Sequence, residues 1–333
     1  MHAPLPHARR YHLPVLSVTL LALVLLTTML AACGGSTPST GINAANLTYT
    51  DATHTTVTLT KQPKRIVCLV GLCEDILASL GIQPVAVNDK MSQDPHFFGS
   101  AAANIPMIGG SFTAPDIEDI AKATPDLIIG IANAHEQLRA ALQPIAPLYI
   151  MNPATYQDSI NYLKDIGQLT GHTAQANTAA QKLLDELNAY KAKSPNNLST
   201  VLIYGPPPNF NTFTQDSLTP SMLEQVTPYA IPAPAAGAPA SSDHEPGAIP
   251  GSLEQLLTIN PDTLLVASFG SSTFSQQLAS NPVWSQLKAV QNHRVFEVNA
   301  SYYVFGRGTI SLGLALQDAM GKLYPSTFPT SLM

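Results

Sequence analysis

One long helical stretch divides this sequence into two halves of similar pattern, and it limits the folds that the chain can adopt. The stretch is Thr173–Lys193, in which apolar residues recur at helical spacing: Ala176, Ala180, Leu184 and Leu187. Gly171 ends the preceding helix, and Pro195 prevents continuation. At 1.5 Å per residue the helix would be about 30 Å long. We therefore predict a rigid linker helix over residues 171–194.

Each half repeats the order strand, helix, strand. Ile66–Val70 is a continuous apolar run ended by Gly71, and an amphipathic stretch and a second run at residues 84–87 follow it. Thr200–Tyr204 opens the second half with the same kind of run. Such runs are typical of strands buried on both faces of a parallel sheet. The predicted fold class is α/β, with two lobes of mostly parallel sheets, residues 61–170 and 195–333, joined by one long rigid helix.

An internal repeat supports two lobes of common plan. IEDIAKATPDLII begins at Ile117, and LEQLLTINPDTLLV begins at Leu253. Both segments place Glu, Pro and Asp at the same offsets, and both end in a buried strand. The matching residues are Glu118, Pro125 and Asp126 in the first segment, and Glu254, Pro261 and Asp262 in the second.

Two further stretches are expected to be loops at the rim of a cleft, because ligands of open α/β sheets bind beyond the carboxyl ends of the strands. Ser111 and Phe112 follow a Gly-Gly pair in the first half. Phe210 and Phe213 lie in PPPNFNTFTQDS, a stretch rich in Pro and Asn that follows a predicted strand.

Composition narrows the choice of partners. The chain has 333 residues, of which 45% are hydrophobic, enough to fill two cores. It carries 16 basic and 22 acidic residues with no basic stripe, so a nucleic-acid partner is excluded.

The N-terminus reads as a secretory signal. Arg9 and Arg10 precede an uncharged run, Leu13–Leu30, which ends in small residues. A transmembrane anchor is the alternative for a run of this length. The stretch Leu-Ala-Ala-Cys-Gly around Cys33 resembles a bacterial lipobox, which implies a signal peptide over residues 1–32 and a lipidated Cys33. The small, polar residues that follow predict a flexible tether over 33–60, which would hold a soluble protein at the outer face of the cell membrane.

Two cysteines remain, Cys68 in a predicted strand and Cys73 just beyond it. An extracytoplasmic address permits a disulfide, but buried thiols are the preferred interpretation. Two cysteines are too few for a structural zinc site.

Taken in order, these segments resemble a known family. PKRIVCLVGLCEDILASLGIQPVAV, the two Glu-to-Pro-Asp segments, NPVWSQLKAVQNHRVFEV and the closing helix are similar to the substrate-binding lipoproteins of ABC importers. More narrowly, they resemble the class that carries ferric siderophores, vitamin B12 and haem. The resemblance implies a ligand cleft between the lobes and only modest closure.

The resemblance also gives roles to particular residues. Glu118 and Glu254 would dock on the membrane permease, one from each lobe. The alternative is that each only stabilises the first turn of its helix. In NASYYVFGRGTISLG, Arg307 stands between two glycines and would face the ligand, unless it pairs with a local acid. Tyr302, Tyr303 and Phe305 would line the cleft, although alternation predicts that at least one of them packs inside.

We therefore expect a monomeric binding protein, not an enzyme, that delivers a ferric siderophore to an ABC permease. The alternatives are cobalamin, haem, or a lipoprotein sensor built from the same lobes. No nucleophile elbow or zinc-protease motif is present. The histidines are scattered singly, which predicts no metal site, and no cofactor is expected beyond the ferric chelate itself. Since only one cleft cation is predicted, a weakly charged chelate is expected rather than ferric citrate.

Overall fold

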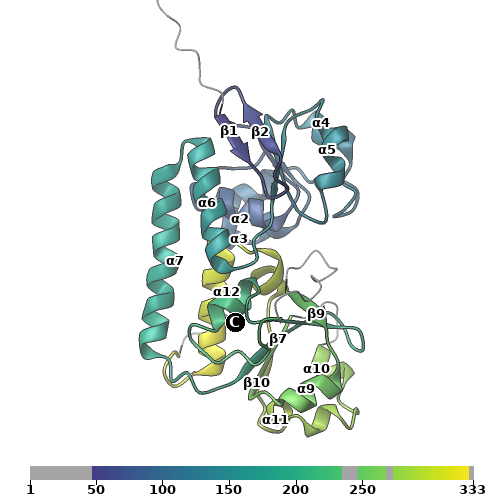
Figure 1. Ribbon diagram of the computed structural model, residues 1–333, viewed down its shortest axis with the longest axis vertical. Coiled ribbons are helices and arrows are strands. Elements are labelled where there is room, and N and C mark those ends of the chain that lie inside the picture. Colours follow the sequence, from purple (N-terminus) through teal and green to yellow (C-terminus); the bar gives the residue numbers. More distant parts are fainter. Residues whose placement is uncertain (1–46, 235–246, 268–272, 330–333) are drawn as a thin grey trace, which may run out of the picture. The chain divides into compact units, whose positions relative to one another are not determined.

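The computed structural model describes residues 47–234, 247–267 and 273–329. The predicted signal peptide and the lipidation site Cys33 lie outside the described residues. Within the described chain, a four-stranded sheet and a separate two-stranded hairpin form before the long helix, and a five-stranded sheet forms after it (Figure 1). We call the four-stranded sheet the first sheet and the five-stranded sheet the second.

The first sheet is parallel throughout, with strand order β4-β3-β5-β6. Every residue of its strands is buried, as the apolar runs predict. The strands are β3 (Ile66–Cys68), β4 (Ala86–Val87), β5 (Leu127–Ile131) and β6 (Leu148–Met151). The helices of this lobe are α2 (Gly71–Leu80), α3 (Pro95–Phe98), α4 (Ile117–Lys122), α5 (Arg139–Leu142) and α6 (Tyr156–Thr170), with 3-10 turns at Met91–Gln93, Gly99–Asn104 and Glu136–Leu138.

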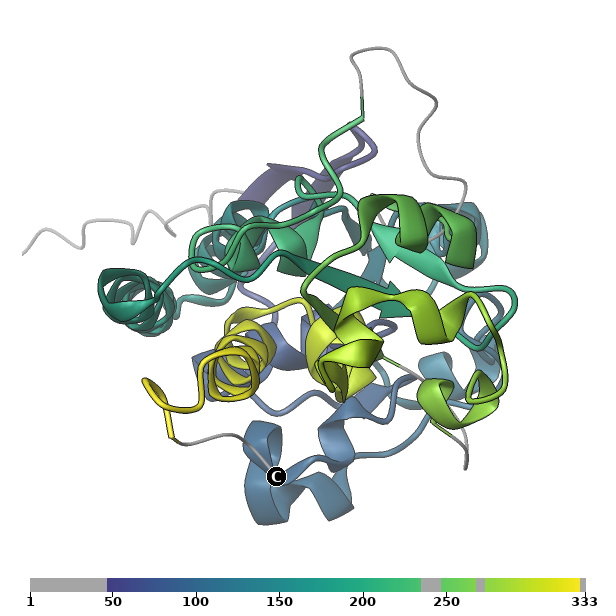
Figure 2. The same cartoon turned by 90° about the horizontal axis from the view of Figure 1, so that it is seen from below.

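The second sheet is mixed, with strand order β11-β10-β7-β8-β9. Strands β11, β10 and β7 are parallel, whereas β8 and β9 add antiparallel strands at one edge. The strands are β7 (Thr200–Tyr204), β8 (Asn211–Phe213), β9 (Ala248–Pro250), β10 (Thr263–Ala267) and β11 (Val295–Glu297). The helical segments are α8 (Leu218–Leu223), α9 (Leu253–Ile259), α10 (Phe274–Gln277), a 3-10 turn at Trp284–Gln286, α11 (Lys288–Gln291), a π-helical turn at Ser301–Phe305 and α12 (Thr309–Leu323). Helix α8 packs against α12, which is the yellow helix in the view from below (Figure 2).

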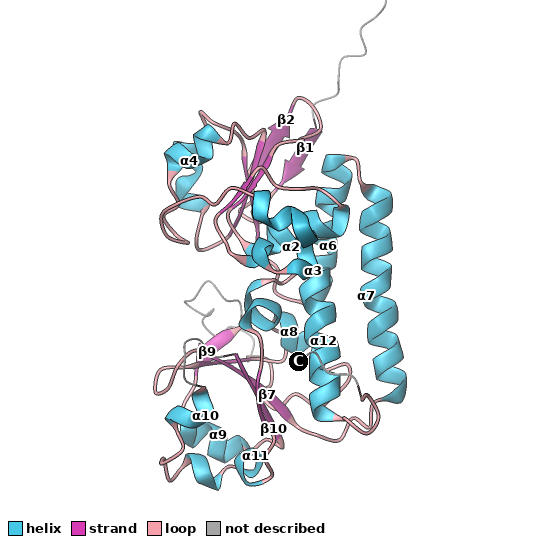
Figure 3. Ribbon diagram, turned by 180° about the vertical axis from the view of Figure 1, so that it is seen from behind, coloured by secondary structure: helices cyan, strands magenta, loops and turns pink. Residues whose placement is uncertain are grey.

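The long helix α7 spans Thr173–Lys193, as the sequence predicts. Its buried residues are Ala176, Ala180, Leu183 and Leu187. It packs against α6 and α12 (Figures 1 and 3). Helix α12 also packs against α2 of the first lobe, so two helices, and not α7 alone, connect the lobes.

The internal repeat has a structural basis in its two aspartates. The Asp126 carboxylate accepts the backbone N–H groups of Lys64 and Arg65, at the entrance to β3. The Asp262 carboxylate accepts the N–H of Ser199, at the entrance to β7. In each lobe the aspartate therefore joins the starts of two neighbouring parallel strands.

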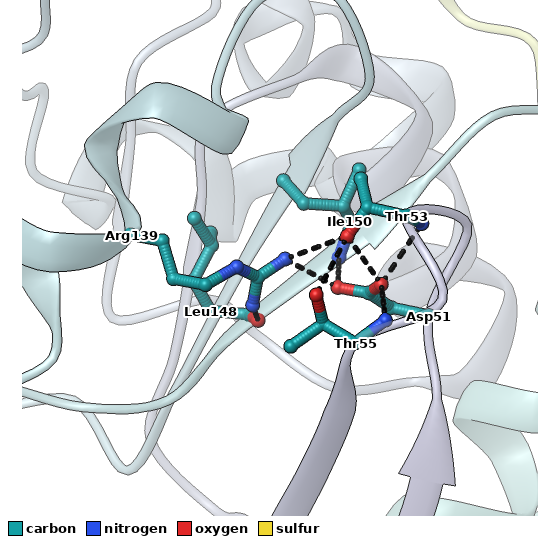
Figure 4. A network of polar contacts seen from close by, with 6 residues as sticks. All are labelled: Asp51, Thr53, Thr55, Arg139, Leu148 and Ile150. Carbon is teal, nitrogen blue, oxygen red and sulfur yellow. Dashed lines mark hydrogen bonds and ion pairs between the residues drawn. The ribbon is translucent and has the colours of Figure 1, made fainter.

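Part of the predicted tether is folded, which corrects the sequence prediction. Strands β1 (Leu47–Thr50) and β2 (Thr56–Leu59) form an antiparallel hairpin. Asp51 at its turn is buried and accepts hydrogen bonds from Thr53, Thr55 and the backbone of Ile150, and it forms an ion pair of 2.6 Å with Arg139 (Figure 4). The Arg139 guanidinium also donates to the carbonyl of Leu148. These contacts fix the hairpin to β6.

The prediction for the two cysteines is also corrected. Cys68 and Cys73 form a disulfide between β3 and the first turn of α2, where buried thiols were expected. The strand turns directly into the helix at Gly71, and this brings the two side chains together.

Candidate ligand-binding site

The carboxyl ends of the parallel strands mark where a ligand of this fold binds. In the first lobe, β3 leads into the turn at Gly71, and β5 leads to His135. In the second lobe, β7 ends at Tyr204, and β11 leads into the π-helical turn Ser301–Phe305. The segment from Ser301 to Ser311 carries most of the residues predicted to bind ligand.

The two tyrosines of this segment make protein contacts. Tyr303 is fully buried and its hydroxyl lies 3.1 Å from Asp318, so it is the residue that packs inside, as alternation predicts. Tyr302 donates its hydroxyl to Asp94 of the first lobe at 2.6 Å, and His96 contacts the same carboxylate. Burial, followed by this hydrogen bond and the Asp94 charge, raises the pKa of Tyr302, so its hydroxyl stays protonated and joins the two lobes.

Phe305 belongs to an aromatic cluster at the end of β7. Its half-buried ring stands edge-on to Tyr204, with centroids 5.7 Å apart, and Tyr204 contacts Phe213 at 6.4 Å. We call Phe305, Tyr204 and Phe213 the aromatic cluster. Tyr204 was missed from sequence, although its place as the last residue of a buried strand could have identified it.

The second predicted rim loop becomes a strand directly after Phe210. Asn211–Phe213 is strand β8, paired with β7 and β9. Phe210 is buried edge-on against Phe274, and the close approach of the Gly251 backbone leaves no space above its ring. The structure thus places Phe210 in the core and brings Phe213, also buried, against Tyr204. The antiparallel ladder explains why this Pro- and Asn-rich stretch is ordered.

Arg307 is buried, with only 3% of its surface exposed. Its Nε donates to the carbonyl of Val304 at 2.9 Å. Burial raises the pKa of Asp89, while backbone hydrogen bonds and the positive charge of Arg307 act against that rise. The guanidinium is therefore placed near an acid of the first lobe, and its donors do not face solvent in this conformation.

Buried acids of α2 lie at the same junction and were not identified from sequence. Asp75 accepts hydrogen bonds from the N–H groups of Ile310 and Ser311 and from the Ser311 hydroxyl, so it caps α12 from the other lobe. A Cβ on Gly308 would lie 2.3 Å from the Asp75 carboxyl carbon. Burial and the Asp89 charge raise the pKa of neighbouring Glu74 to about 9, so Glu74 is neutral at physiological pH.

Ser111 and Phe112 lie on an exposed loop of the first lobe. Phe112 is 36% exposed, and its ring stands edge-on to buried His135 with centroids 5.0 Å apart. They are therefore the predicted site residues most open to solvent, and they belong to the lobe opposite the aromatic cluster.

A groove of about 690 Å³ opens elsewhere, between α7 and α12. It is flanked by Lys182 and Glu186, and its wall also includes His96, which contacts Tyr302. None of the predicted ligand residues lines it, so we place the candidate site at the strand ends.

Metal and membrane features were also sought within the described ranges. Among residues 47–234, 247–267 and 273–329, no group of three His, Cys, Asp or Glu side chains is placed to hold a metal ion. No helix of this part combines the length and apolar character needed to cross a membrane.

Comparison with known proteins decides the family. Residues 66–302 match the model of the family described as periplasmic binding protein. The chain belongs to the periplasmic binding protein family. The predicted family, the two-lobe α/β fold and the absence of an enzymatic role are thereby confirmed.

Individual members resemble this periplasmic binding protein over most of their length. The Fe(3+) dicitrate-binding periplasmic protein FecB of Escherichia coli is 28% identical, covering 77% of this chain and 83% of FecB. The putative ABC transporter substrate-binding lipoprotein YhfQ of Bacillus subtilis is 27% identical, covering 93% and 98%. The crystal structure of Staphylococcus aureus SirA complexed with staphyloferrin B has the same fold, with a TM-score of 0.67 and 20% identity over 83% of this chain and 98% of SirA.

The two glutamates predicted to dock this periplasmic binding protein are exposed at equivalent places. Glu118 lies in the first turn of α4, which Asp116 caps. Glu254 lies in the first turn of α9, which Ser252 caps. Each helix is followed by the Pro-Asp of the repeat, so each lobe presents one carboxylate from the same element.

Proposed function

We propose that this protein is the extracytoplasmic substrate-binding component of an ABC importer and that it captures a ferric siderophore between its lobes. The observation that carries the proposal is that aromatic side chains lie at the carboxyl ends of the parallel strands in both lobes. The first lobe presents exposed Phe112 and the second lobe presents the aromatic cluster. Helices α7 and α12 connect the two lobes. Aromatic surface in a largely preformed cleft suits an organic chelate that already encloses its iron.

Ferric citrate is the first ligand to test. FecB is named for it, although the expectation from sequence favoured a less charged chelate because Arg307 is the one predicted cleft cation. The buried position of Arg307 also favours the less charged chelate over ferric citrate. An anionic chelate would have to draw the guanidinium away from Asp89.

Calorimetric titration of the full-length chain in detergent tests the ligand. Ferric citrate, a ferric hydroxamate, a ferric catecholate, cobalamin and haem are each added. Saturable binding of one ferric compound supports the proposal. If only cobalamin or haem binds, that compound replaces the ferric siderophore as the proposed ligand. If none of the compounds binds, the result contradicts their uptake and favours the sensor role.

Phe305→Ala tests the aromatic cluster. It should weaken binding of the ferric compound about tenfold, because it removes one ring from the cleft wall. Phe328→Ala is the matched control. Phe328 is also half-buried and edge-on to a tyrosine, Tyr190, but it lies beside α7. An equal loss of affinity in both variants would show that the aromatic cluster is not part of the binding site.

Docking through Glu118 and Glu254 is part of the proposal. Changing both to Lys should leave binding of the ferric compound intact and abolish its uptake by cells, because each lobe then presents the wrong charge to the permease. Glu224→Lys, at an exposed position after α8, is the control and should not affect uptake. Unimpaired uptake by the double variant contradicts the docking role.

We also propose that Cys33 carries a lipid that anchors the protein outside the cell. Cys33→Ala should move the protein from the membrane fraction to the soluble fraction. A variant that remains membrane-bound would favour a transmembrane anchor over residues 13–30.

A further inference from the structure

His135 is a buried histidine whose two ring nitrogens both have backbone partners. Its side chain is fully inaccessible to solvent. Nδ1 lies 3.1 Å from the backbone nitrogen of Ile131, whose N–H it accepts. Nε2 lies 2.8 Å from the carbonyl oxygen of Phe112, which lies 23 residues away in sequence.

These contacts determine the tautomer. A carbonyl oxygen can only accept, so Nε2 carries the proton, and the N–H of Ile131 can only donate, so Nδ1 does not. The ring folds back over β5 because residue 130 is glycine. A Cβ there would lie 2.8 Å from the His135 Cβ. His135 is thus held as a neutral imidazole with one donor directed at Phe112.

The loop that carries Phe112 is closed at its base and held at its tip. Gly110 pairs with Pro115, and the N–H of Ser111 and the carbonyl of Ala114 lie 3.0 Å apart. Gly110 has φ of +87°, and a Cβ there would lie 2.3 Å from the Ala114 oxygen. Beyond these local bonds, the Phe112 carbonyl and ring both rest on His135.

The loop places Phe112 at the carboxyl ends of the strands of the first sheet, where the candidate ligand site lies. Met107 forms a parallel bridge with Val87, the last residue of β4, so the chain from Met107 onward continues past the carboxyl ends of the strands. His135 follows β5 at the same edge. A ring that is 36% exposed and held from behind is available for contact.

We infer that His135 is a positioning residue for ligand binding, which holds Phe112 as a preformed apolar contact for the organic part of a ferric siderophore. The inference rests on the proposed function. Fixing the ring in the ligand-free protein lowers the conformational entropy lost on binding. It also gives a buried polar residue of the first lobe a role that the sequence did not suggest.

Two substitutions separate the two hydrogen bonds. The amide of Asn reaches the position of Nδ1, so His135→Asn can still accept from Ile131 but loses the donor to Phe112. The longer Gln reaches the position of Nε2, so His135→Gln keeps that donor. Both remove the imidazole, and His135→Gln also removes the acceptor of the Ile131 N–H, so thermal unfolding measures the general defect of each variant separately.

The first measurement uses the full-length chain without ligand. Hydrogen exchange at the amides of Ser111 and Ala114 should accelerate about 5- to 10-fold in His135→Asn, as expected for one lost hydrogen bond. The rates in His135→Gln should stay near the parent values. Equal rates in the parent and His135→Asn would overturn the inference, and this result does not depend on the identity of the ligand.

The second measurement is calorimetric titration with ferric citrate and with a ferric hydroxamate. For whichever binds, His135→Asn should raise Kd about 5- to 10-fold and His135→Gln should not. In a Phe112→Ala background, His135→Asn should have no further effect on Kd. A full additional loss there would overturn the inference, because His135 would then act through another residue. Failure of the parent chain to bind either of these compounds or the ferric catecholate contradicts the proposed ligand class, while the exchange rates still decide whether His135 holds the loop.

Discussion

Asp75 offers the sharpest test of how the two lobes are joined. Its carboxylate is fully buried and caps the N-terminus of α12, with Ile310 N–H at 3.0 Å and Ser311 N–H at 2.8 Å. Burial raises its pKa from the usual 3.8 to about 6, and the hydrogen bonds from Ser311 and Ile310 only partly offset the rise. We consider Asp75→Asn, which keeps the shape and removes the titration.

The sign of the pH effect follows from the raised pKa. The folded protein binds a proton at Asp75 more tightly than the unfolded chain does, so the free energy of unfolding contributed by this group increases as pH falls through about 6. An ordinary ion-paired aspartate behaves in the opposite way. Between pH 7 and pH 5, linkage with pKa values of about 6 and 3.8 gives a gain of roughly 1–2 kcal/mol in the parent protein that the variant lacks.

Urea unfolding followed by circular dichroism at pH 7 and pH 5 measures this difference. Asp75→Asn should cost roughly 1–3 kcal/mol at pH 7, because one buried N–H now meets an amide NH₂. The cost should be larger by roughly 1–2 kcal/mol at pH 5. Asp185→Asn on the exposed face of α7 is the control and should change stability by less than about 0.5 kcal/mol at either pH. A cost of Asp75→Asn that does not change with pH would refute the reasoning.

Two further predictions concern the first lobe. Cys73→Ser should lower the free energy of unfolding by about 2 kcal/mol, as expected for a disulfide across a sequence separation of 5, and a reducing agent should give the same loss in the parent but none in the variant. Asp51→Asn should cost about 2 kcal/mol, because the half-buried Arg139 guanidinium loses its carboxylate partner and keeps only its bonds to Leu148 and Thr53, and protection of the hairpin amides should fall with it. Burial favours a higher pKa for Asp51, but hydrogen bonds from Thr53 and Arg139 hold it below the usual value, so this contribution should disappear as pH falls below about 4. Parent-like stability in either variant contradicts the corresponding contact.

The elements that sequence predicts well are those with strong hydrophobic periodicity. Helix α7 has the expected bounds, the closing helix is present as α12, and the apolar runs at Ile66 and Thr200 form the buried strands β3 and β7. The repeat was also recognisable, because Asp126 and Asp262 recur before equivalent strands for the same hydrogen-bonding reason. Local sequence carries this information.

The features that were missed depend on partners far along the chain. The hairpin at residues 47–59 is rich in Thr and looks like a tether, but Asp51 is fixed by Arg139, 88 residues away. His135 is an isolated histidine in sequence, and its role depends on the Phe112 carbonyl. Neither pairing leaves a signal in a local window, since a buried polar group is recognisable only through the partner that satisfies it.

The glycines around Arg307 show how one local pattern can have two physical causes. In sequence they accompany an arginine expected to face the ligand, but in the structure Gly308 leaves room for Asp75, and a Cβ on Gly306 would meet Ser311 and Met91. At Gly308 the close approach comes from the other lobe, and at Gly306 it comes from Ser311 of the same lobe and from Met91 of the other. The segment from Ser301 to Ser311 therefore carries the inter-lobe contacts through Tyr302 and the capped start of α12, and it also presents Phe305 to the aromatic cluster. The same segment thus holds the junction of the lobes and carries a residue of the aromatic cluster. A substitution that alters the junction should therefore also displace Phe305. We expect the ligand affinity and the stability of the lobe junction to change together.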